Sequence, residues 1–310
     1  MKLLVTGGSG LVGSAISKIK TNYNYEFIFI SSKDCDLTNY GETYNYFKSH
    51  NPDYVIHLAA FVGGLFRNMN QKSDMLERNL LMNFNVINIC HKLQVKKVVS
   101  CLSTCIFPDK IQYPIDETML HMGKPHCSND VYAYSKRMLE IHSRMYNEHY
   151  NDNFVCIIPT NIYGENDFYS LEDGHVIPSL IHKCYLSKKN NVKFTVRGTG
   201  RPLRQFIYSK DLAELIMWSL DNYNDKQPII LSVSEKDEVT IKDVAELIAK
   251  EYNYQHMLEF DSSYSDGQYK KTADNSKLIE LYGNYNFTNI KDGIKNSVEW
   301  FINNYNNCRK

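Results

Sequence analysis

The chain has 310 residues, enough for one large domain or two smaller ones with a buried core. Lys+Arg and Asp+Glu each total 35, so the formal net charge is zero, which argues against a general binder of nucleic acids or of anionic membrane surfaces. No stretch resembles the apolar core of a signal peptide or a membrane span, and the eight scattered cysteines form no CxxC pair, so we expect a soluble cytoplasmic protein with reduced thiols.

Over the first 164 residues, short apolar runs alternate with segments of helical periodicity. The pattern predicts strands at 2–7, 27–32, 54–60 and 96–104, a strand followed by a turn at 154–164, and helices at 11–22, 40–50, 76–93 and 132–150. This alternation predicts an α/β fold with a doubly wound parallel sheet of the Rossmann type. Because the crossovers are right-handed, the carboxyl ends of these strands should lie along one edge.

Beyond about residue 164 the regular alternation ends. A polar stretch at 165–174 precedes predicted helices at 175–188, 239–252 and 289–305 and a strand-to-helix unit at 206–220. We expect residues 1–164 to form the dinucleotide-binding domain, with residues 204–232 returning to it, and residues 165–310 to form mainly a smaller, mixed substrate-binding domain.

The sequence TGGSGLVG at 6–13 follows the first predicted strand and opens the first predicted helix. It satisfies G-x-x-G-x-x-G through Gly7, Gly10 and Gly13, and G-x-G-x-x-G when counted from Gly8. Glycines permit a tight turn and a close backbone approach, and the following helix N-terminus attracts a pyrophosphate. The alternative is a glycine-rich turn without a ligand, but the strand–turn–helix context favours dinucleotide binding.

The end of the second predicted strand bears on the choice of nicotinamide cofactor. It reads Ser-Ser-Lys at 31–33, with Ser9 of the glycine loop expected nearby. Hydroxyl donors and positive charge suit the 2′-phosphate of NADP, whereas an acidic residue would suit the ribose 2′-OH of NAD. Asp34 keeps the NAD alternative open, and we expect Asp36 to meet the edge of the adenine ring.

Two further segments carry candidate catalytic groups. In YAYSK, Tyr132 and Lys136 lie one helical turn apart, so the ammonium should stabilise the phenolate and lower the pKa of the tyrosine. Upstream, the predicted strand at 96–104 leads into Ser103 and Cys105, which alternation would place on the same face. The alternative for the pair is an exposed helix face, and for the cysteine a buried core position.

Longer stretches accompany these motifs and strengthen a resemblance. They are HLAAFVGGLFRN (57–68), CLSTCIFPDK (101–110), YPIDET (113–118), PTNIYG (159–164), EDGHVIPSLIHK (172–183), RQFIYSKDLA (204–213) and DGQYKKTADNSKL (266–278). Together the motifs resemble the extended short-chain dehydrogenase/reductase superfamily, and within it the family of 3,5-epimerase–4-reductases that act on GDP-4-keto-6-deoxy-D-mannose. The resemblance runs from Lys2 to the C-terminus.

The resemblance implies an NADPH-dependent enzyme that inverts C3 and C5 of the keto sugar and reduces C4, giving GDP-L-fucose. It implies a homodimer formed through the helices at 76–93 and 132–150, a nucleotide-sugar substrate and no metal. The protons on C3 and C5 are acidic because both carbons adjoin the ketone, and a thiol and an imidazole can serve as base and acid. This work falls to Cys105 and His175, while Tyr132 protonates the C4 oxygen with help from Lys136 and Ser103. From the residues alone, His175 could equally be a loop or helix-cap residue.

Further positions carry over as binding residues. The cofactor residues implied by the motifs and the resemblance are Gly7, Gly8, Ser9, Gly10, Leu11, Val12, Gly13, Ser32, Lys33, Asp36, Ala59, Ala60, Leu102, Lys136, Pro159, Thr160, Asn161, Ile162 and His175. The GDP contacts implied are Lys183, Arg197, Arg204 and Asp266. At Arg197 the chain departs from the family, which usually has tryptophan there, although an arginine plane can also stack on a base.

Two other functions remain as alternatives. A related nucleotide-sugar 4,6-dehydratase or 4-epimerase would share the fold, but such dehydratases carry Asp-Glu where this chain has Thr104 and Cys105. A non-catalytic NADP-binding protein would typically have lost Tyr132 or Lys136, and both are present.

Overall fold

The computed structural model describes residues 1–63 and 71–310. Part of the motif at 57–68, from residue 64 onward, therefore lies outside the described residues. Within them, none of the helices has the length and apolar character needed to cross a membrane.

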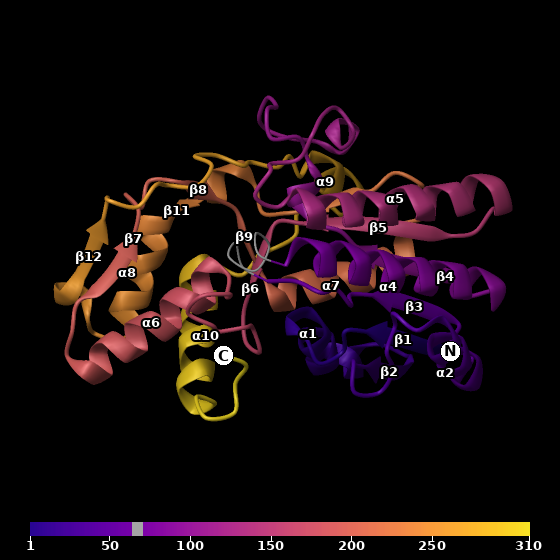
Figure 1. The fold of residues 1–310 in the computed structure, drawn as a ribbon, viewed down its shortest axis with the longest axis horizontal. Coiled ribbons are helices and arrows are strands. Elements are labelled where there is room, and N and C mark those ends of the chain that lie inside the picture. Colours follow the sequence, from indigo (N-terminus) through magenta and orange to yellow (C-terminus); the bar gives the residue numbers. More distant parts are fainter. Residues whose placement is uncertain (64–70) are drawn as a thin grey trace.

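A six-stranded sheet forms one half of the molecule, on the right in Figure 1. Its order is β10 (Ile229–Leu231), β5 (Phe154–Pro159), β4 (Lys97–Cys101), β3 (Tyr54–His57), β1 (Lys2–Thr6) and β2 (Glu26–Ile30). Every neighbouring pair is parallel, so the predicted doubly wound α/β fold is confirmed. The strands are continuous apolar runs because a parallel sheet is covered on both faces.

Helices cover the two faces of this sheet and form two cores. Alternation along β1 sends Leu4 into one core and Leu3 and Val5 into the other. The first core is completed by α2 (Tyr40–His50), α4 (Lys72–Lys92) and α5 (Asp130–Tyr150), and the second by α1 (Leu11–Ile19) and α7 (Ser209–Asn222).

A third core lies in the other half, on the left in Figure 1. Its helices are α6 (Val176–Asn190), α8 (Ile241–Glu251) and α10 (Ile290–Asn303), and two short strand pairs join them. These pairs are β7 (Phe194–Arg197) with β12 (Leu258–Asp261) and β8 (Leu203–Arg204) with β11 (Val239–Thr240). Between the halves, β6 (Asn161–Tyr163) pairs with β9 (Phe206–Tyr208), and α9 (Ser276–Tyr282) returns to the sheet, where Leu278 enters the second core.

The strand predicted at 96–104 is too long. Strand β4 ends at Cys101, and Thr104–Ile106 form a 3₁₀ turn with Ser103 as its N-cap. The prediction failed because the apolar run continues past the last ladder position, while the serine offers a local partner for the turn: its Oγ accepts the N–H of Cys105 at 3.4 Å.

Candidate active site

A cavity of about 1370 Å³ opens at the carboxyl edge of the sheet, between its strands and the C-terminal half. Residues from the loop after β1 and from the ends of β4 and β5 line one side, and residues from α6 and from the loop at 265–271 line the other. In a doubly wound sheet this edge is where ligands bind.

The glycine loop forms one end of the cavity. Gly7 has φ +68°, and a Cβ there would come within 2.9 Å of the backbone nitrogen of Ala59. A Cβ on Gly13 would meet the carbonyl oxygen of Gly7 at 2.5 Å, so the first turn of α1 can approach the strand only without a side chain. Gly8 differs from the prediction, because it packs on β2, donates to the Ile30 carbonyl at 2.8 Å and does not line the cavity.

In the turn after β2, the Asp34 carboxylate is hydrogen-bonded to Ser31. Its carboxylate accepts the N–H of Ser31 at 2.8 Å and the hydroxyl of Ser31 at 2.7 Å, and these hydrogen bonds hold the pKa of Asp34 below its usual value. Ser31 and Ser32 line the cavity, whereas Lys33 is exposed and outside its lining. Asp34 is therefore engaged within its own turn, which weighs against the NAD alternative.

Helix α5 presents the predicted Tyr132 and Lys136 to the cavity. The Lys136 Nζ donates to the Cys101 carbonyl at 2.7 Å and lies 5.8 Å from the centre of the Tyr132 ring. Burial raises the pKa of Tyr132 well above its usual value, and the thiols of Cys105 and Cys101 add to the rise. The expected lowering by the ammonium is not present here, so the phenol is protonated.

Cys105 follows Ser103 around the 3₁₀ turn and also lines the cavity. Burial raises the pKa of its thiol, and the Lys271 ammonium and the Ser103 hydroxyl act in the opposite direction. Lys271 is half-buried in the cavity wall, where burial lowers its own pKa. Sequence reasoning missed this lysine because nothing in its neighbourhood distinguishes it from the adjacent Lys270.

His175 also lines the cavity, at the N-cap position of α6. Its side chain makes no capping hydrogen bond to the helix and is exposed, so the helix-cap alternative does not describe its contacts. The imidazole is therefore available to a molecule in the cavity.

The far end of the cavity carries the groups predicted for the nucleotide. Arg197 and Arg204 line it, and the Arg197 guanidinium lies 4.8 Å from the centre of the Tyr264 ring. Asp266 also lines it, but its carboxylate accepts the N–H of Thr199 at 2.8 Å and the Thr199 hydroxyl at 2.6 Å. Lys183 lies outside the lining, where burial and the charge of Arg197 lower its pKa.

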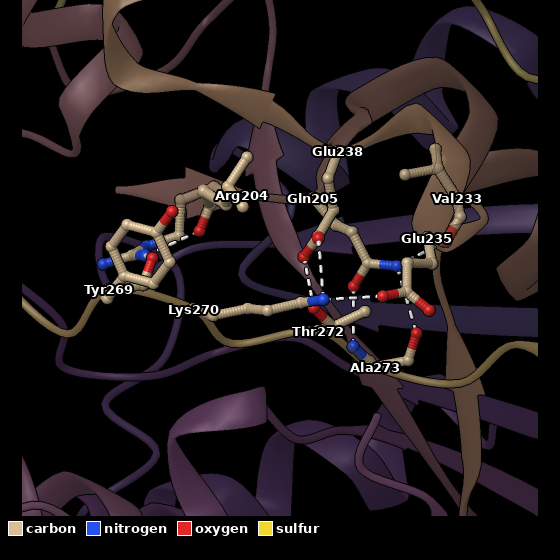
Figure 2. A network of polar contacts seen from close by, with 10 residues as sticks. Arg204, Gln205, Val233, Glu235, Glu238, Tyr269, Lys270, Thr272 and Ala273 are labelled. Carbon is tan, nitrogen blue, oxygen red and sulfur yellow. Dashed lines mark hydrogen bonds and ion pairs between the residues drawn. The ribbon is translucent and has the colours of Figure 1, made fainter. Parts of the chain in front are cut away.

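A polar network fixes the segment that carries Lys271 (Figure 2). The buried side chain of Gln205 donates to the carbonyls of Val233 and Ala273 at 2.8 and 3.0 Å and accepts the Ala273 N–H at 2.8 Å. Beside it, Lys270 pairs with Glu235 at 2.6 Å. The network ties the segment 270–273 to Gln205, Val233 and Glu235, and Lys271 within this segment lines the cavity.

The structure thus brings most of the predicted residues to one cavity. Those that line it are Gly7, Ser9, Gly10, Leu11, Val12, Gly13, Ser32, Asp36, Ala59, Ala60, Leu102, Ser103, Cys105, Tyr132, Lys136, Pro159, Thr160, Asn161, Ile162, His175, Arg197, Arg204 and Asp266. Lining residues that the sequence reasoning missed include Arg78, Asn129, Asp167, Lys271 and Arg309.

In the described part of the chain, no group of three or more His, Cys, Asp or Glu side chains could hold a metal ion. All eight cysteines are free.

The doubly wound sheet, the glycine loop and the Tyr–Lys pair on one cavity define a dinucleotide-binding protein of the oxidoreductase class. Residues 3–234 match the NAD dependent epimerase/dehydratase family. GDP-L-fucose synthase from Dictyostelium discoideum is 54% identical over 99% of this chain and 97% of its own length, and a probable GDP-L-fucose synthase from Drosophila melanogaster is 49% identical over 100% and 99%. A crystal structure of a GDP-L-fucose synthetase from Naegleria fowleri bound to NADP matches with a TM-score of 0.96 at 46% identity, covering 100% of this chain and 95% of that one.

The chain therefore belongs to the NAD dependent epimerase/dehydratase family and, within it, to the GDP-L-fucose synthase family. This confirms the resemblance found in the sequence.

Proposed function

We propose that this protein converts GDP-4-keto-6-deoxy-D-mannose to GDP-L-fucose by 3,5-epimerisation followed by NADPH-dependent reduction of the 4-keto group. The observation that carries the proposal is that one cavity joins the glycine loop, the Tyr132–Lys136 pair, Cys105 and His175. Each part of the two-stage reaction then has a chemical group within the same enclosed space.

The glycine loop and the N-terminus of α1 hold the pyrophosphate of NADP, and Ser32 supplies a donor toward the 2′-phosphate. When bound, NADPH supplies the hydride that reaches C4. Leu102 and the stretch 159–162 line the same cavity and would hold the nicotinamide end.

Epimerisation uses Cys105 and His175. Each removes or returns a proton at carbons that adjoin the ketone, and an inversion requires one group on each side of the sugar ring. Both side chains line the same cavity and come from different elements, Cys105 from the 3₁₀ turn after β4 and His175 from the start of α6, which supports this assignment. Burial raises the pKa of Cys105, so its thiol is protonated at rest, and the nearby Lys271 charge stabilises the thiolate that forms when Cys105 alternates between acid and base.

Reduction uses Tyr132 as the proton donor to the C4 oxygen. Its raised pKa keeps the phenol protonated until negative charge develops on that oxygen. Lys136 orients the site through its hydrogen bond to the Cys101 carbonyl, and Ser103 donates to the same substrate oxygen.

The GDP portion lies toward Arg197, Arg204 and Asp266, with Lys183 behind them. Guanidinium groups suit the diphosphate, and the Arg197 plane takes the stacking place that tryptophan has in the family. Residues 1–164 with 204–232 form the cofactor domain, and residues 165–310 form mainly the substrate domain, apart from short returns such as Leu278.

We also assign a homodimer formed through α4 and α5, which pack against each other. Their outer surface carries large apolar side chains that are 41–56% exposed, namely Leu81, Phe84, Met138 and Met145. Apolar exposure on two adjacent helices is typical of a surface covered by a second copy. We expect the enzyme in the cytoplasm, in keeping with its free thiols.

The test incubates the purified protein with GDP-4-keto-6-deoxy-D-mannose and NADPH and identifies the sugar by NMR. We expect GDP-L-fucose, and Cys105→Ser should stop deuterium entry at C3 and C5 in heavy water. A product inverted at neither carbon would instead indicate a simple 4-reductase. Absence of NADPH oxidation with any related keto sugar would favour a non-catalytic NADP-binding protein.

A further inference from the structure

The loop that precedes α6 carries a buried carboxylate that has no part in the mechanism above. Asp167 is 4% exposed and lines the cavity. Its Oδ1 accepts the N–H of Phe168 at 2.7 Å, whereas its Oδ2 is buried without a hydrogen-bond partner. A buried carboxylate oxygen without a partner is costly, so its presence on a cavity wall points to a partner that arrives during function.

Two positively chargeable side chains interact with this carboxylate, His175 and Arg309. Their charges lower the pKa of Asp167, but burial outweighs them and raises it to about 6. The Arg309 guanidinium donates to the Asn166 carbonyl at 2.5 Å, so it is engaged next to the carboxylate rather than on it. The His175 side chain, in contrast, makes no capping hydrogen bond to helix α6.

We propose that Asp167 is the positioning residue for His175: its free Oδ2 accepts an imidazole N–H when substrate fills the cavity and stabilises the imidazolium that forms when His175 takes a proton from the sugar. A carboxylate behind a catalytic histidine sets the tautomer, fixes the ring and favours the charged form. When His175 breaks the C–H bond and forms its N–H bond, the electron pair forms the C=C bond of an enolate and negative charge moves to the C4 oxygen. A different proton, from the Cys105 thiol, then forms the new C–H bond on the other face, the ketone is restored, and the imidazolium and thiolate return to their resting forms by proton exchange with solvent. The inference rests on the proposed function, because it presumes that His175 is an acid–base group.

The experiment follows deuterium entry at C3 and C5 of GDP-4-keto-6-deoxy-D-mannose in heavy water, with NADP⁺ in place of NADPH so that no reduction occurs. Asp167→Asn keeps the acceptor for the Phe168 N–H but removes the charge. We expect kcat for exchange to fall 10- to 100-fold, the size of effect seen when an outer partner of a functional histidine is lost, with KM for the sugar nucleotide within about twofold. Asp167→Ser, a second variant that retains an acceptor, should lose exchange in the same way.

Glu165→Gln is the matched control, because it removes a carboxylate from the same loop that pairs with Lys18 at 2.9 Å and does not line the cavity. It should exchange at the wild-type rate. Adding Asp167→Asn to His175→Asn should cause no further loss, since the carboxylate acts through the imidazole.

Normal exchange in both Asp167 variants, or a fully additive loss in the double variant, would overturn the inference. A loss in Asp173→Asn without one in Asp167→Asn would also overturn it, because Asp173 lines the same cavity and has a buried unpaired oxygen of its own. These results differ from a failure of the proposed function, in which the wild-type protein itself would neither exchange the protons nor make GDP-L-fucose.

Discussion

At the scale of single residues, burial decides the protonation states of the reacting groups. Tyr132 and Cys105 both have raised pKa values because their surroundings disfavour the charged forms. Both are therefore protonated in the resting protein, and for Tyr132 this suits a reaction that ends with a proton on the C4 oxygen. In the resting protein the Lys136 ammonium therefore does not lower the pKa of Tyr132, contrary to the expectation from their spacing.

Tyr132→Phe tests this role, since it retains the ring and deletes the donor. General acid catalysis contributes about 10²- to 10⁴-fold, so NADPH oxidation with the keto sugar should fall by that range. Deuterium entry at C3 and C5 should persist, because those protons are assigned to other groups. Turnover close to that of the wild type would remove Tyr132 from the mechanism.

The pKa of Asp167 also affects stability. Its folded value of about 6 lies above the ordinary 3.8, so the folded state holds the proton more tightly, and stability from this group is present below about pH 4 and lost as the pH rises through 6. The loss amounts to about 3 kcal/mol, at 1.36 kcal/mol per pKa unit. Denaturant unfolding of the wild type and Asp167→Asn at pH 4.5 and 7.5 should therefore show the variant gaining relative stability at the higher pH. A pH-independent difference between the two proteins would contradict the assigned pKa.

At the scale of elements, the cofactor end depends on how β2 and α1 terminate. Helix α1 has no acidic residue in its first turn, and its N-cap is Gly10, whose missing side chain leaves the helix N–H groups open to a phosphate. Strand β2 ends at Ile30, so Ser31 and Ser32 reach the cavity while the carboxylate of Asp34 turns back on Ser31. The start of α1 and the end of β2 thus present helix N–H groups and serine hydroxyls to the cavity, while Ser31 holds the Asp34 carboxylate.

Ser32→Asp should reverse that preference, because a carboxylate repels the 2′-phosphate and accepts from a free 2′-OH. We expect the ratio of NADPH to NADH affinity to fall at least about tenfold, or 1.4 kcal/mol, measured by fluorescence titration of both cofactors. Lys33→Glu adds charge to the same turn outside the cavity lining, so its effect should be smaller. Equal affinity of the wild type for NADPH and NADH would show that Ser31 and Ser32 confer no preference for the 2′-phosphate.

At the scale of the whole molecule, the site exists because two halves with separate cores meet along one edge. The first two cores cover the sheet and the third supports the C-terminal half, while the β6–β9 pair links them. Cys105 and Tyr132 come from the sheet side, His175 and Asp167 come from the segment entering α6, and Lys271 comes from a third, distant segment. Closure of the cavity therefore depends on contacts between segments far apart in the sequence.

The proposed dimer is a prediction at this scale. Phe84 on α4 is 56% exposed and stacks on His142 of α5 with ring centres 4.2 Å apart. Phe84→Glu would bury a charge at the centre of the interface and should convert the dimer to a monomer in sedimentation equilibrium. Leu281→Glu, at a 49% exposed apolar position on α9, should remain dimeric. A wild-type protein that sediments as a monomer would rule the assignment out.

The sequence by itself determined the parallel sheet, the glycine loop and the Tyr132–Lys136 pair, because each depends on local periodicity or on residues within one turn of each other. Its motifs also identified the family, and most of the residues they named line one cavity. Only the tertiary structure decided that β4 stops at Cys101, that Asp34 is engaged by Ser31, and that Lys271 and Asp167 line the same cavity as Cys105 and His175. These outcomes depend on burial, on competition between hydrogen-bond partners and on charges from distant segments. All three arise when segments far apart in the sequence pack together, so they cannot be predicted from the spacing of nearby residues.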